Sequence, residues 1–149
     1  LVERMKDLVV GDPVLDTTFT GPVISMEAAE RFSELALENA AFTISKAPRC
    51  MEPNAANYVS PFIVSGLDEE NELDFMDSGL PILDVKVVPD LEGAFEELSN
   101  TECGMSAGIF SKNAEAIARL KSDCDAPVKY VNESTRRLSP VVGLDLDKF

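Results

Sequence analysis

The chain has 149 residues, enough for one domain with a substantial core, and 45% of them are hydrophobic, as is typical of globular proteins. Its formal net charge is −14, from 27 acidic and 13 basic residues, and no basic patch occurs in the sequence. Nucleic acids and anionic membranes are therefore poor partners, and no apolar run is long enough to span a membrane.

The first ten residues predict the end of a helix. Their apolar stripe consists of Val2, Met5, Leu8 and Val9. Gly11 ends this helix, and Pro13 prevents its continuation into the loop that follows. Because the chain begins at Leu1, inside the predicted helix and without a methionine, we expect further chain upstream.

Ser25 precedes a second predicted helix, at residues 25–39. Its hydroxyl can accept a hydrogen bond from the first turn, where two glutamates favour the positive end of the helix dipole. One face of this helix carries Ala28, Phe32, Leu35, Ala36 and Asn39. We expect Phe32 and Leu35 to pack against the core.

The middle of the chain is less regular. Residues 40–44 either extend the preceding helix or begin a strand. Residues 58–64 form an apolar run that contains Pro61, which predicts an edge strand or an extended segment, because proline cannot donate to a sheet. The acidic residues between positions 68 and 74 predict a solvated loop or helix surface. A metal site would need ligands that converge, which a run alone does not provide.

From residue 82 onwards, predicted strands alternate with predicted helices. The strands lie at 82–88, 105–110 and 128–131, and the helices at 91–99 and 113–123. This alternation predicts right-handed βαβ crossovers with the three strands in one parallel sheet. The fold class is therefore α/β, a parallel sheet of βαβ units, and residues 1–149 form a single partial domain.

The helix at 91–99 has a clear core-facing side. Its apolar stripe consists of Leu91, Ala94, Phe95 and Leu98. Asp90 is placed to cap this helix, and we expect Phe95 to lie buried between the helix and the sheet.

Three cysteines, Cys50, Cys103 and Cys124, show no metal-type spacing. An odd number of cysteines without a secretory signal predicts a reducing, cytoplasmic location, and each thiol is expected to be structural. The sequence has no histidine, which excludes Ser-His, Cys-His and His-metal chemistry.

Four short motifs resemble the aldehyde dehydrogenase superfamily. Residues 100–111 read Asn-Thr-Glu-Cys-Gly-Met-Ser-Ala-Gly-Ile-Phe-Ser, and residues 128–132 read Val-Lys-Tyr-Val-Asn. Upstream, residues 10–13 read Val-Gly-Asp-Pro, and residues 18–25 contain Gly-Pro-Val-Ile-Ser. The order and the spacing of these motifs match the later part of the family's catalytic domain. The resemblance covers about residues 1–132 and implies that domain's fold.

The resemblance also implies where a cofactor would be contacted. The family carries Glu-x-Phe-Gly-Pro before its apolar strand, with the Glu on the nicotinamide ribose and the Phe beside the nicotinamide. Here Met76 stands at the Glu position and Ser78 at the Phe position, and Gly79 is retained. Methionine cannot accept a hydrogen bond from a ribose hydroxyl as a carboxylate does. We therefore expect NAD or NADP in a full-length enzyme and no cofactor bound by this chain alone.

No catalytic residue and no metal ligand is assigned within the chain. By resemblance, the nucleophilic cysteine, the general base and the dinucleotide-binding domain all precede Leu1. Cys103 matches a tyrosine in a turn of the family, and Cys50, beside Arg49, has no base to activate it. No glycine-rich phosphate loop occurs.

Three hypotheses follow for the function. The chain is part of an NAD(P)-dependent aldehyde dehydrogenase-like oxidoreductase, which converts an aldehyde to an acid, and is inactive alone. Alternatively, it is a non-catalytic interaction or subunit module of the same fold, or a CoA-acylating relative. Because a sheet without its upstream strands has an open edge, we expect a homo-oligomer or association with the upstream part of the same enzyme.

Overall fold

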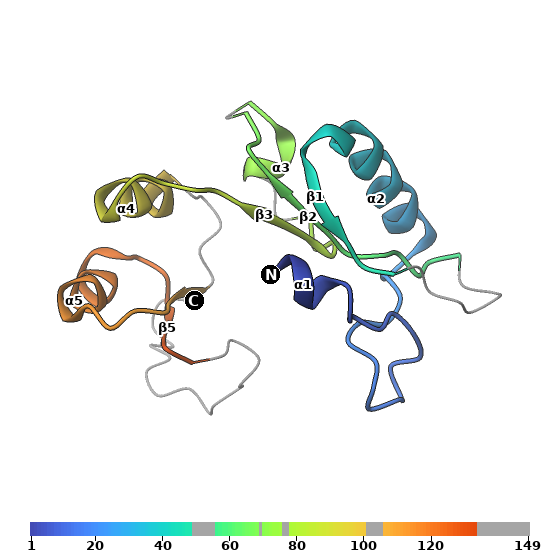
Figure 1. The fold of residues 1–149 in the computed structure, drawn as a ribbon, viewed down its shortest axis with the longest axis horizontal. Helices are drawn as coiled ribbons and strands as arrows, with labels where there is room; N and C mark the ends of the chain where they lie inside the picture. The colour runs from blue at the N-terminus through green and yellow to red at the C-terminus, as the bar shows by residue number, and fades with distance from the viewer. Residues whose placement is uncertain (49–55, 69, 76–77, 101–105, 134–149) are drawn as a thin grey trace. The chain divides into compact units, whose positions relative to one another are not determined.

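The structure is a computed structural model that describes residues 1–48, 56–68, 70–75, 78–100 and 106–133. The chain divides into two compact units, Leu1–Val87 and Val88–Phe149. The elements of the first unit are α1 (Val2–Met5), α2 (Met26–Glu38), the 3₁₀ turn η1 (Ala40–Phe42), β1 (Thr43–Lys46), β2 (Phe62–Ser65), α3 (Glu72–Phe75) and β3 (Ile82–Val85) (Figure 1). Those of the second are α4 (Leu91–Asn100), β4 (Ser106–Ile109), α5 (Ala114–Asp123) and β5 (Val128–Val131).

The first unit contains a three-stranded sheet in the order β1-β2-β3. β1 is antiparallel to β2, and β2 is parallel to β3, with Phe62 opposite Ile82. The predicted edge strand is therefore wrong, because β2 is the central strand and Phe62, Ile63 and Val64 are at most 2% exposed. Pro61 lies directly before β2, where a missing amide hydrogen costs no ladder bond.

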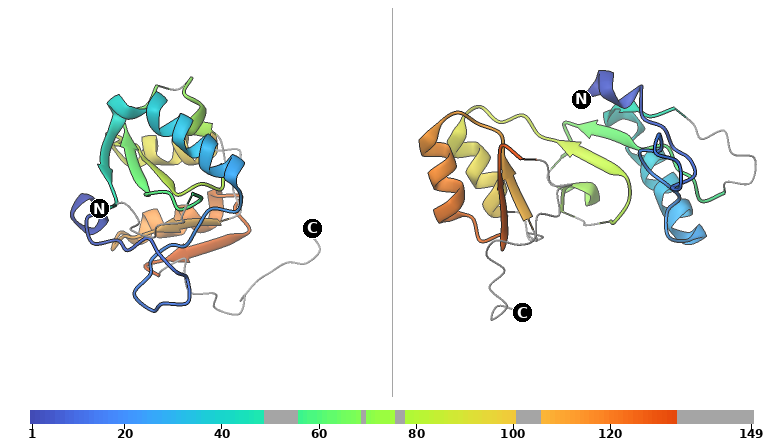
Figure 2. Two further views of the ribbon diagram at one scale, coloured as in Figure 1. Left: turned by 90° about the vertical axis from the view of Figure 1, so that its right-hand side faces the viewer. Right: turned by 90° about the horizontal axis from the view of Figure 1, so that it is seen from below.

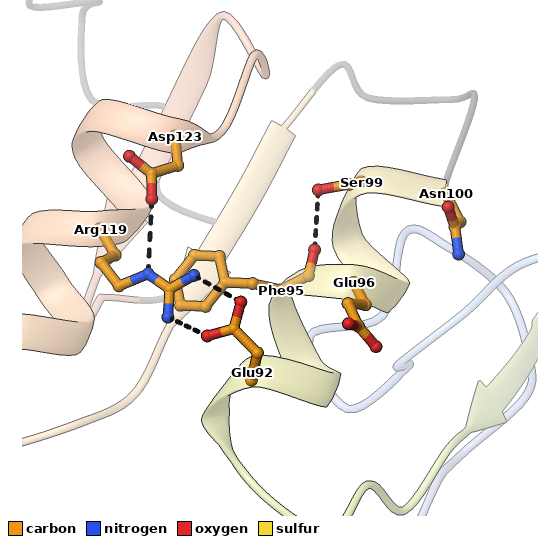
Figure 3. Close-up of a pocket in the computed structure, with 7 residues that line it drawn as sticks. All are labelled: Glu92, Phe95, Glu96, Ser99, Asn100, Arg119 and Asp123. Atoms are coloured by element: carbon orange, nitrogen blue, oxygen red, sulfur yellow. Dashed lines mark hydrogen bonds and ion pairs between the residues drawn. The ribbon is translucent and has the colours of Figure 1, made fainter.

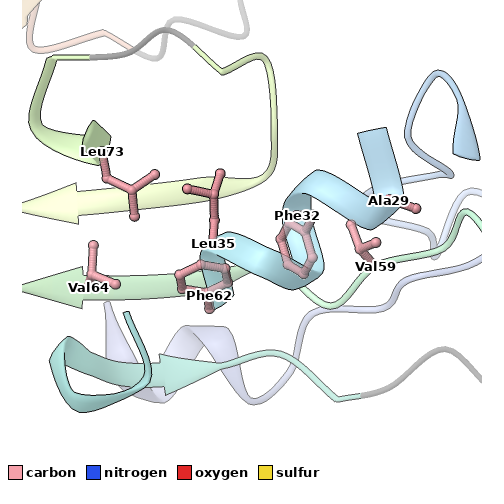
Figure 4. Packing of buried hydrophobic residues seen from close by; sticks show 7 residues of the cluster. All are labelled: Ala29, Phe32, Leu35, Val59, Phe62, Val64 and Leu73. Atoms are coloured by element: carbon pink, nitrogen blue, oxygen red, sulfur yellow. The ribbon is translucent and has the colours of Figure 1, made fainter. Parts of the chain in front are cut away.

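Apolar side chains cover both faces of this sheet. On one face, Phe32 and Leu35 of α2 pack with Phe62, as predicted, and the rings of Phe32 and Phe62 meet edge to face with centroids 5.2 Å apart (Figure 4). On the other face, Met5 of α1 packs with Ile63. α1 is shorter than the predicted helix.

The ends of α2 are tied by side chains. Ser25 Oγ accepts a hydrogen bond from the Ala28 amide at 3.1 Å, which confirms the predicted N-cap. At the other end, buried Asn39 donates from Nδ2 to the Leu35 carbonyl at 3.0 Å. Residues 40–44, whose sequence is compatible with either a helix or a strand, form the 3₁₀ turn η1 and then the start of β1.

The second unit is one βαβ unit with an additional helix. β4 and β5 are parallel, with Ala107 opposite Lys129, and α5 connects them. Figure 2 shows α4 and α5 on the same side of this pair of strands. Their shared core consists of Phe95, Ala107, Leu120, Cys124 and Ala126. Phe95 is buried as predicted, and Asp90 Oδ1 accepts from the Gly93 amide at 3.0 Å as a helix cap.

The α/β class with parallel strands is confirmed. The strand predicted at 82–88 corresponds to β3, which pairs with β2 in the first unit. Within the described residues, β4 pairs with β5 in a separate two-stranded sheet. β3 ends at Val85, short of the predicted boundary, and the second unit begins at Val88.

None of the helices in the described part of the chain is long and apolar enough to cross a membrane.

Candidate functional site

The turn before β3 holds two of the three positions that the sequence links to a cofactor. Ser78 and Gly79 lie in it, whereas Met76 lies outside the described residues. Ser78 Oγ accepts a hydrogen bond from the Leu80 amide at 3.2 Å. Gly79 has a φ of +60°, a left-handed conformation that favours glycine, although a Cβ there would meet nothing within 4 Å. Backbone conformation thus explains the retained glycine.

Two contacts join this turn to the first unit. The Pro81 carbonyl accepts from the Phe62 amide at 3.3 Å, which joins the turn to the central strand. Leu80 packs against the core beneath α2. The turn is therefore joined to the core of the first unit at the amino end of β3.

The segment just upstream of the turn is tied to α2 by two polar contacts. Asn71 donates from Nδ2 to Asn39 Oδ1 at 2.8 Å, and its own Oδ1 accepts from the Leu73 amide at 3.0 Å. Arg31 forms an ion pair with Glu72, and the hydrogen bond to Glu72 raises the pKa of the arginine. The sequence did not predict these contacts, because their partners lie far apart along the chain.

The side chain at position 78 does not fit the nicotinamide contact that the resemblance assigns to it. A phenylalanine would present an aromatic face, whereas Ser78 has a short side chain whose oxygen accepts a hydrogen bond from its own turn. Serine offers neither the aromatic surface nor the apolar area of the expected residue.

A second feature is an open pocket of about 510 Å³ between α4 and α5 (Figure 3). Its lining residues are Glu92, Phe95, Glu96, Ser99, Asn100, Arg119 and Asp123. The Arg119 guanidinium lies over the Phe95 ring, 4.3 Å from the centroid. The same group makes two bonds to Glu92, at 2.8 and 3.3 Å, and one to Asp123 at 3.4 Å.

Arg119 is paired with two of the three carboxylates that line this pocket, those of Glu92 and Asp123. The hydrogen bond to Glu92 raises the pKa of Arg119. The pKa of Asp123 is lowered, first by the hydrogen bond from Ser122 and then by Arg119. Because Arg119 already has two carboxylate partners, it is poorly suited to hold a phosphate or a carboxylate ligand. The pocket is best explained as a polar junction of two helices. The spacing of Arg119 and Asp123, four residues apart on one helix, was the signal available in the sequence.

The remaining candidate that the structure describes adds no catalytic group. Cys124 is buried in the second core, as expected of a structural thiol, and Cys50 and Cys103 lie outside the described residues. Among the residues that the structure describes, no three acidic or cysteine side chains are grouped so that they could hold a metal ion.

Comparison with known proteins gives a consistent result along the sequence. The family model described as "Aldehyde dehydrogenase family" matches residues 1–144. A sulfoacetaldehyde dehydrogenase of Neptuniibacter caesariensis is 30% identical over 133 residues, which are 89% of this chain and 29% of that protein. A lactaldehyde dehydrogenase of Methanococcus maripaludis is 29% identical over 136 residues, which are 90% of this chain and 28% of that protein. The chain thus spans less than a third of these relatives.

Solved structures share the fold. Proline utilization A from Bdellovibrio bacteriovorus matches with a TM-score of 0.81 at 23% identity, over 90% of this chain and 14% of that chain. HpcC from Thermus thermophilus matches with a TM-score of 0.78 at 24% identity, over 94% and 29%. A betaine aldehyde dehydrogenase from Staphylococcus aureus, in complex with NAD⁺, has a TM-score of 0.78 at 18% identity, over 91% and 28%.

Proposed function

The chain belongs to the aldehyde dehydrogenase family, and we propose that it forms the later part of the catalytic domain of an NAD(P)-dependent oxidoreductase that converts an aldehyde to an acid. The observation that carries this proposal is the family match over residues 1–144, which includes every helix and strand that the structure describes. The partial coverage of the relatives supports a role within a longer enzyme.

The substrate class is a small aldehyde with a polar or charged substituent. Sulfoacetaldehyde and lactaldehyde, the aldehydes in the names of two relatives, both have a polar or charged substituent. They are therefore the first aldehydes to test, with a betaine aldehyde as a cationic third.

The chain alone is inactive under this proposal. By resemblance, the nucleophile and the general base belong to preceding chain, and the sequence has no histidine that could replace the base. By resemblance, Ser78 stands at the family's position beside the nicotinamide, and its hydroxyl accepts a hydrogen bond within its own turn. Without a nucleophile, covalent catalysis is lost, and without a dinucleotide-binding domain the cofactor is not held.

The test is calorimetric titration of the chain with NAD and NADP, beside a spectrophotometric assay on the three aldehydes. We expect neither binding in the micromolar range nor turnover. A double variant, Met76→Glu with Ser78→Phe, restores the family's residues at both positions. The same titrations and assay on this variant are the matched comparison for the wild-type chain. Turnover by the wild-type chain that disappears in Cys50→Ala or Cys103→Ala would contradict the proposal, because one of these thiols would then be a nucleophile.

A second candidate is a non-catalytic module of the same family that binds a partner or another subunit. The substitutions at positions 76 and 78 favour it, since they remove the side chains expected at the nicotinamide. The intact coding sequence separates the two. An upstream Gly-Gln-x-Cys type motif supports the enzyme, and a complete reading frame without one supports the module.

For either function we propose a cytoplasmic protein that associates with further copies or with upstream polypeptide. The odd number of cysteines and the edge strands of the sheets, as far as the described residues form them, are the reasons. Sedimentation of the chain as a monomer at high concentration would count against self-association.

A further inference from the structure

A short segment of the first unit covers one part of its core. We call residues 70–75, which contain α3, the 70–75 strap. Leu73 of the strap is 8% exposed and packs in the core cluster beneath α2 (Figure 4). Asn71 of the strap donates a hydrogen bond to Asn39 at the end of α2. Release of the strap therefore exposes this part of the core to water.

The strap and α2 carry charges of the same sign. Glu70 and Glu72 are exposed on the strap, and exposed Asp68 lies just before it. On α2 the charged residues are the glutamates Glu27, Glu30, Glu34 and Glu38 and the single basic residue Arg31. Like charges four residues apart on a helix repel each other, as do like charges on neighbouring segments. Electrostatic repulsion therefore opposes the contact between the strap and α2.

One guanidinium lies between these two acidic surfaces. Arg31 Nη1 donates to Glu34 Oε2 at 3.2 Å, and Arg31 Nη2 donates to Glu72 Oε2 of the strap. The hydrogen bond to Glu72, followed by that to Glu34, raises the pKa of Arg31. Arg31 thus shares its charge between a carboxylate of its own helix and a carboxylate of the strap. Removal of that charge leaves Glu34 and Glu72 close together without the cation that separates them.

Ionic strength acts unequally on the attraction and on the repulsion. The bonds of Arg31 are direct contacts, whereas charged residues one helical turn apart have Cβ atoms separated by about 5–6 Å. The screening length falls from about 20 Å at 0.02 M salt to about 3 Å at 1 M salt. Added salt therefore removes most of the repulsion, while part of the contact attraction remains.

We propose that the 70–75 strap is a salt-responsive closure over the core of the first unit, and that Arg31 is the residue that holds it closed at low ionic strength. Added salt strengthens the attachment, because it screens the repulsion between the strap and α2. Opening of the strap requires neither a cofactor nor further polypeptide, so the proposal is independent of the proposed function.

The experiment measures amide hydrogen exchange by NMR on the full chain, in 0.02 M and in 1 M KCl. Two amides report on the strap. The Asn71 amide donates to the Asp68 carbonyl at 2.8 Å, and the Leu73 amide donates to Asn71 Oδ1 at 3.0 Å. The Phe62 amide, which donates to the Pro81 carbonyl at 3.3 Å, reports on the sheet and distinguishes local opening from unfolding of the whole unit.

The test variant is Arg31→Gln, and Arg31→Gln combined with Glu34→Gln is the compensated variant, in which one of the two repelling carboxylates is also neutral. Arg119→Gln is the matched control, because Arg119 is likewise shared between two carboxylates but lies in the second unit. These substitutions separate the charge of Arg31 from its contribution to packing, since glutamine retains part of the side chain and a hydrogen-bond donor.

In Arg31→Gln we expect the protection factors of the two strap amides to fall about fivefold in 0.02 M KCl, the upper size for an exposed ion pair, and to return to within about twofold of wild type in 1 M KCl. The compensated variant should stay within about twofold of wild type at both salt concentrations. In wild type, the strap amides should be about twofold better protected in 1 M KCl. The control should leave them unchanged.

Several results would overturn the proposal. One is a loss of protection in Arg31→Gln that is equal at both salt concentrations, because Arg31 would then act through packing. Another is an equal loss at the Phe62 amide, because the whole sheet would then be destabilised. Unchanged strap protection in Arg31→Gln, a compensated variant as poorly protected as Arg31→Gln, or wild-type protection that does not rise in 1 M KCl would each contradict it as well.

Discussion

The two compact units place their central aromatic side chains in opposite settings. In the first unit, Phe62 of the central strand is 1% exposed and meets the Phe32 ring in an all-apolar core. In the second unit, Phe95 is buried on one side and covered on the other by the Arg119 guanidinium, at 4.3 Å from the ring centroid. The aromatic ring of the first unit is thus surrounded by apolar side chains, whereas the ring of the second unit is covered on one side by a charged group.

The two sheets also differ in how their faces are buried. Side chains of β2 alternate between two buried cores, one beneath α2 and one beneath α1. In the second unit, Ala107 and Ile109 face α4 and α5, whereas the alternate residues Ser106 and Gly108 are exposed. Parallel strands are usually covered on both faces. We conclude that the stability of the first unit depends on apolar burial on both faces of its sheet. The second unit has a smaller apolar core, on one face of its strands, and a polar contact between α4 and α5.

The largest expected effect is that of Phe62→Ala in the first unit. Removal of a fully buried ring leaves a cavity between α2 and the sheet, and the free energy of unfolding should fall by about 4–5 kcal/mol. The chain has two tyrosines and no tryptophan, so Tyr58 fluorescence reports on the first unit and Tyr130 fluorescence on the second.

Urea titration of Phe62→Ala in Tyr58→Phe and Tyr130→Phe backgrounds then follows each unit separately. A shift of the Tyr58 transition that leaves the Tyr130 transition in place would sharpen the comparison. Equal shifts of both would break it, because the units would then unfold as one.

Phe95→Ala in the second unit should cost about 3 kcal/mol, at the lower end of the range for aromatic-to-alanine changes. Its ring contacts a smaller core, and Arg119 can turn toward water after the ring is removed. The Tyr130 transition in urea measures the effect. An unchanged midpoint would contradict the packing of α4 against the sheet.

Asn39→Ala should cost about 1–3 kcal/mol, because the buried amide is lost and Asn71 keeps an unpaired donor in a partly buried place. Asn71→Ala is the matched control and should cost less, since Asn39 still donates to Leu35. The Tyr58 transition measures both. If the two variants cost the same, the amide pair does not account for the ordering of the segment before β3.

Asp123→Asn should have the smallest effect, and one that depends on pH. The folded-state pKa of Asp123 is lowered by Ser122 and by Arg119, so the ionised form stabilises the folded state. This contribution is present above the pKa of the unfolded chain, about 4, and is lost as the pH falls through the lower folded-state value.

The measurement is the urea midpoint of wild type and Asp123→Asn between about pH 6 and pH 3. The difference should shrink on acidification, and it should also shrink in 1 M salt, since the pair is exposed and screened. A difference that grows toward pH 3 would contradict the assignment.

The sequence by itself determined the local elements of this protein. Helical spacing of apolar residues predicted α2, α4 and α5, and the caps at Ser25 and Asp90 were visible as residue types with known preferences. The motifs at residues 10–13 and 100–111 led to the family without any structure. These features depend on neighbours within a few positions, which a sequence contains directly.

Only the tertiary structure decided which strands pair and which polar groups meet. β2 became central because β1 and β3 add to its two edges, and β3 joined the first unit although its sequence resembles the strands of the second. The pairs Asn39–Asn71 and Glu92–Arg119 join residues 32 and 27 positions apart. Such contacts form only when distant segments are brought together by burial of their apolar faces, and no local pattern specifies their partners.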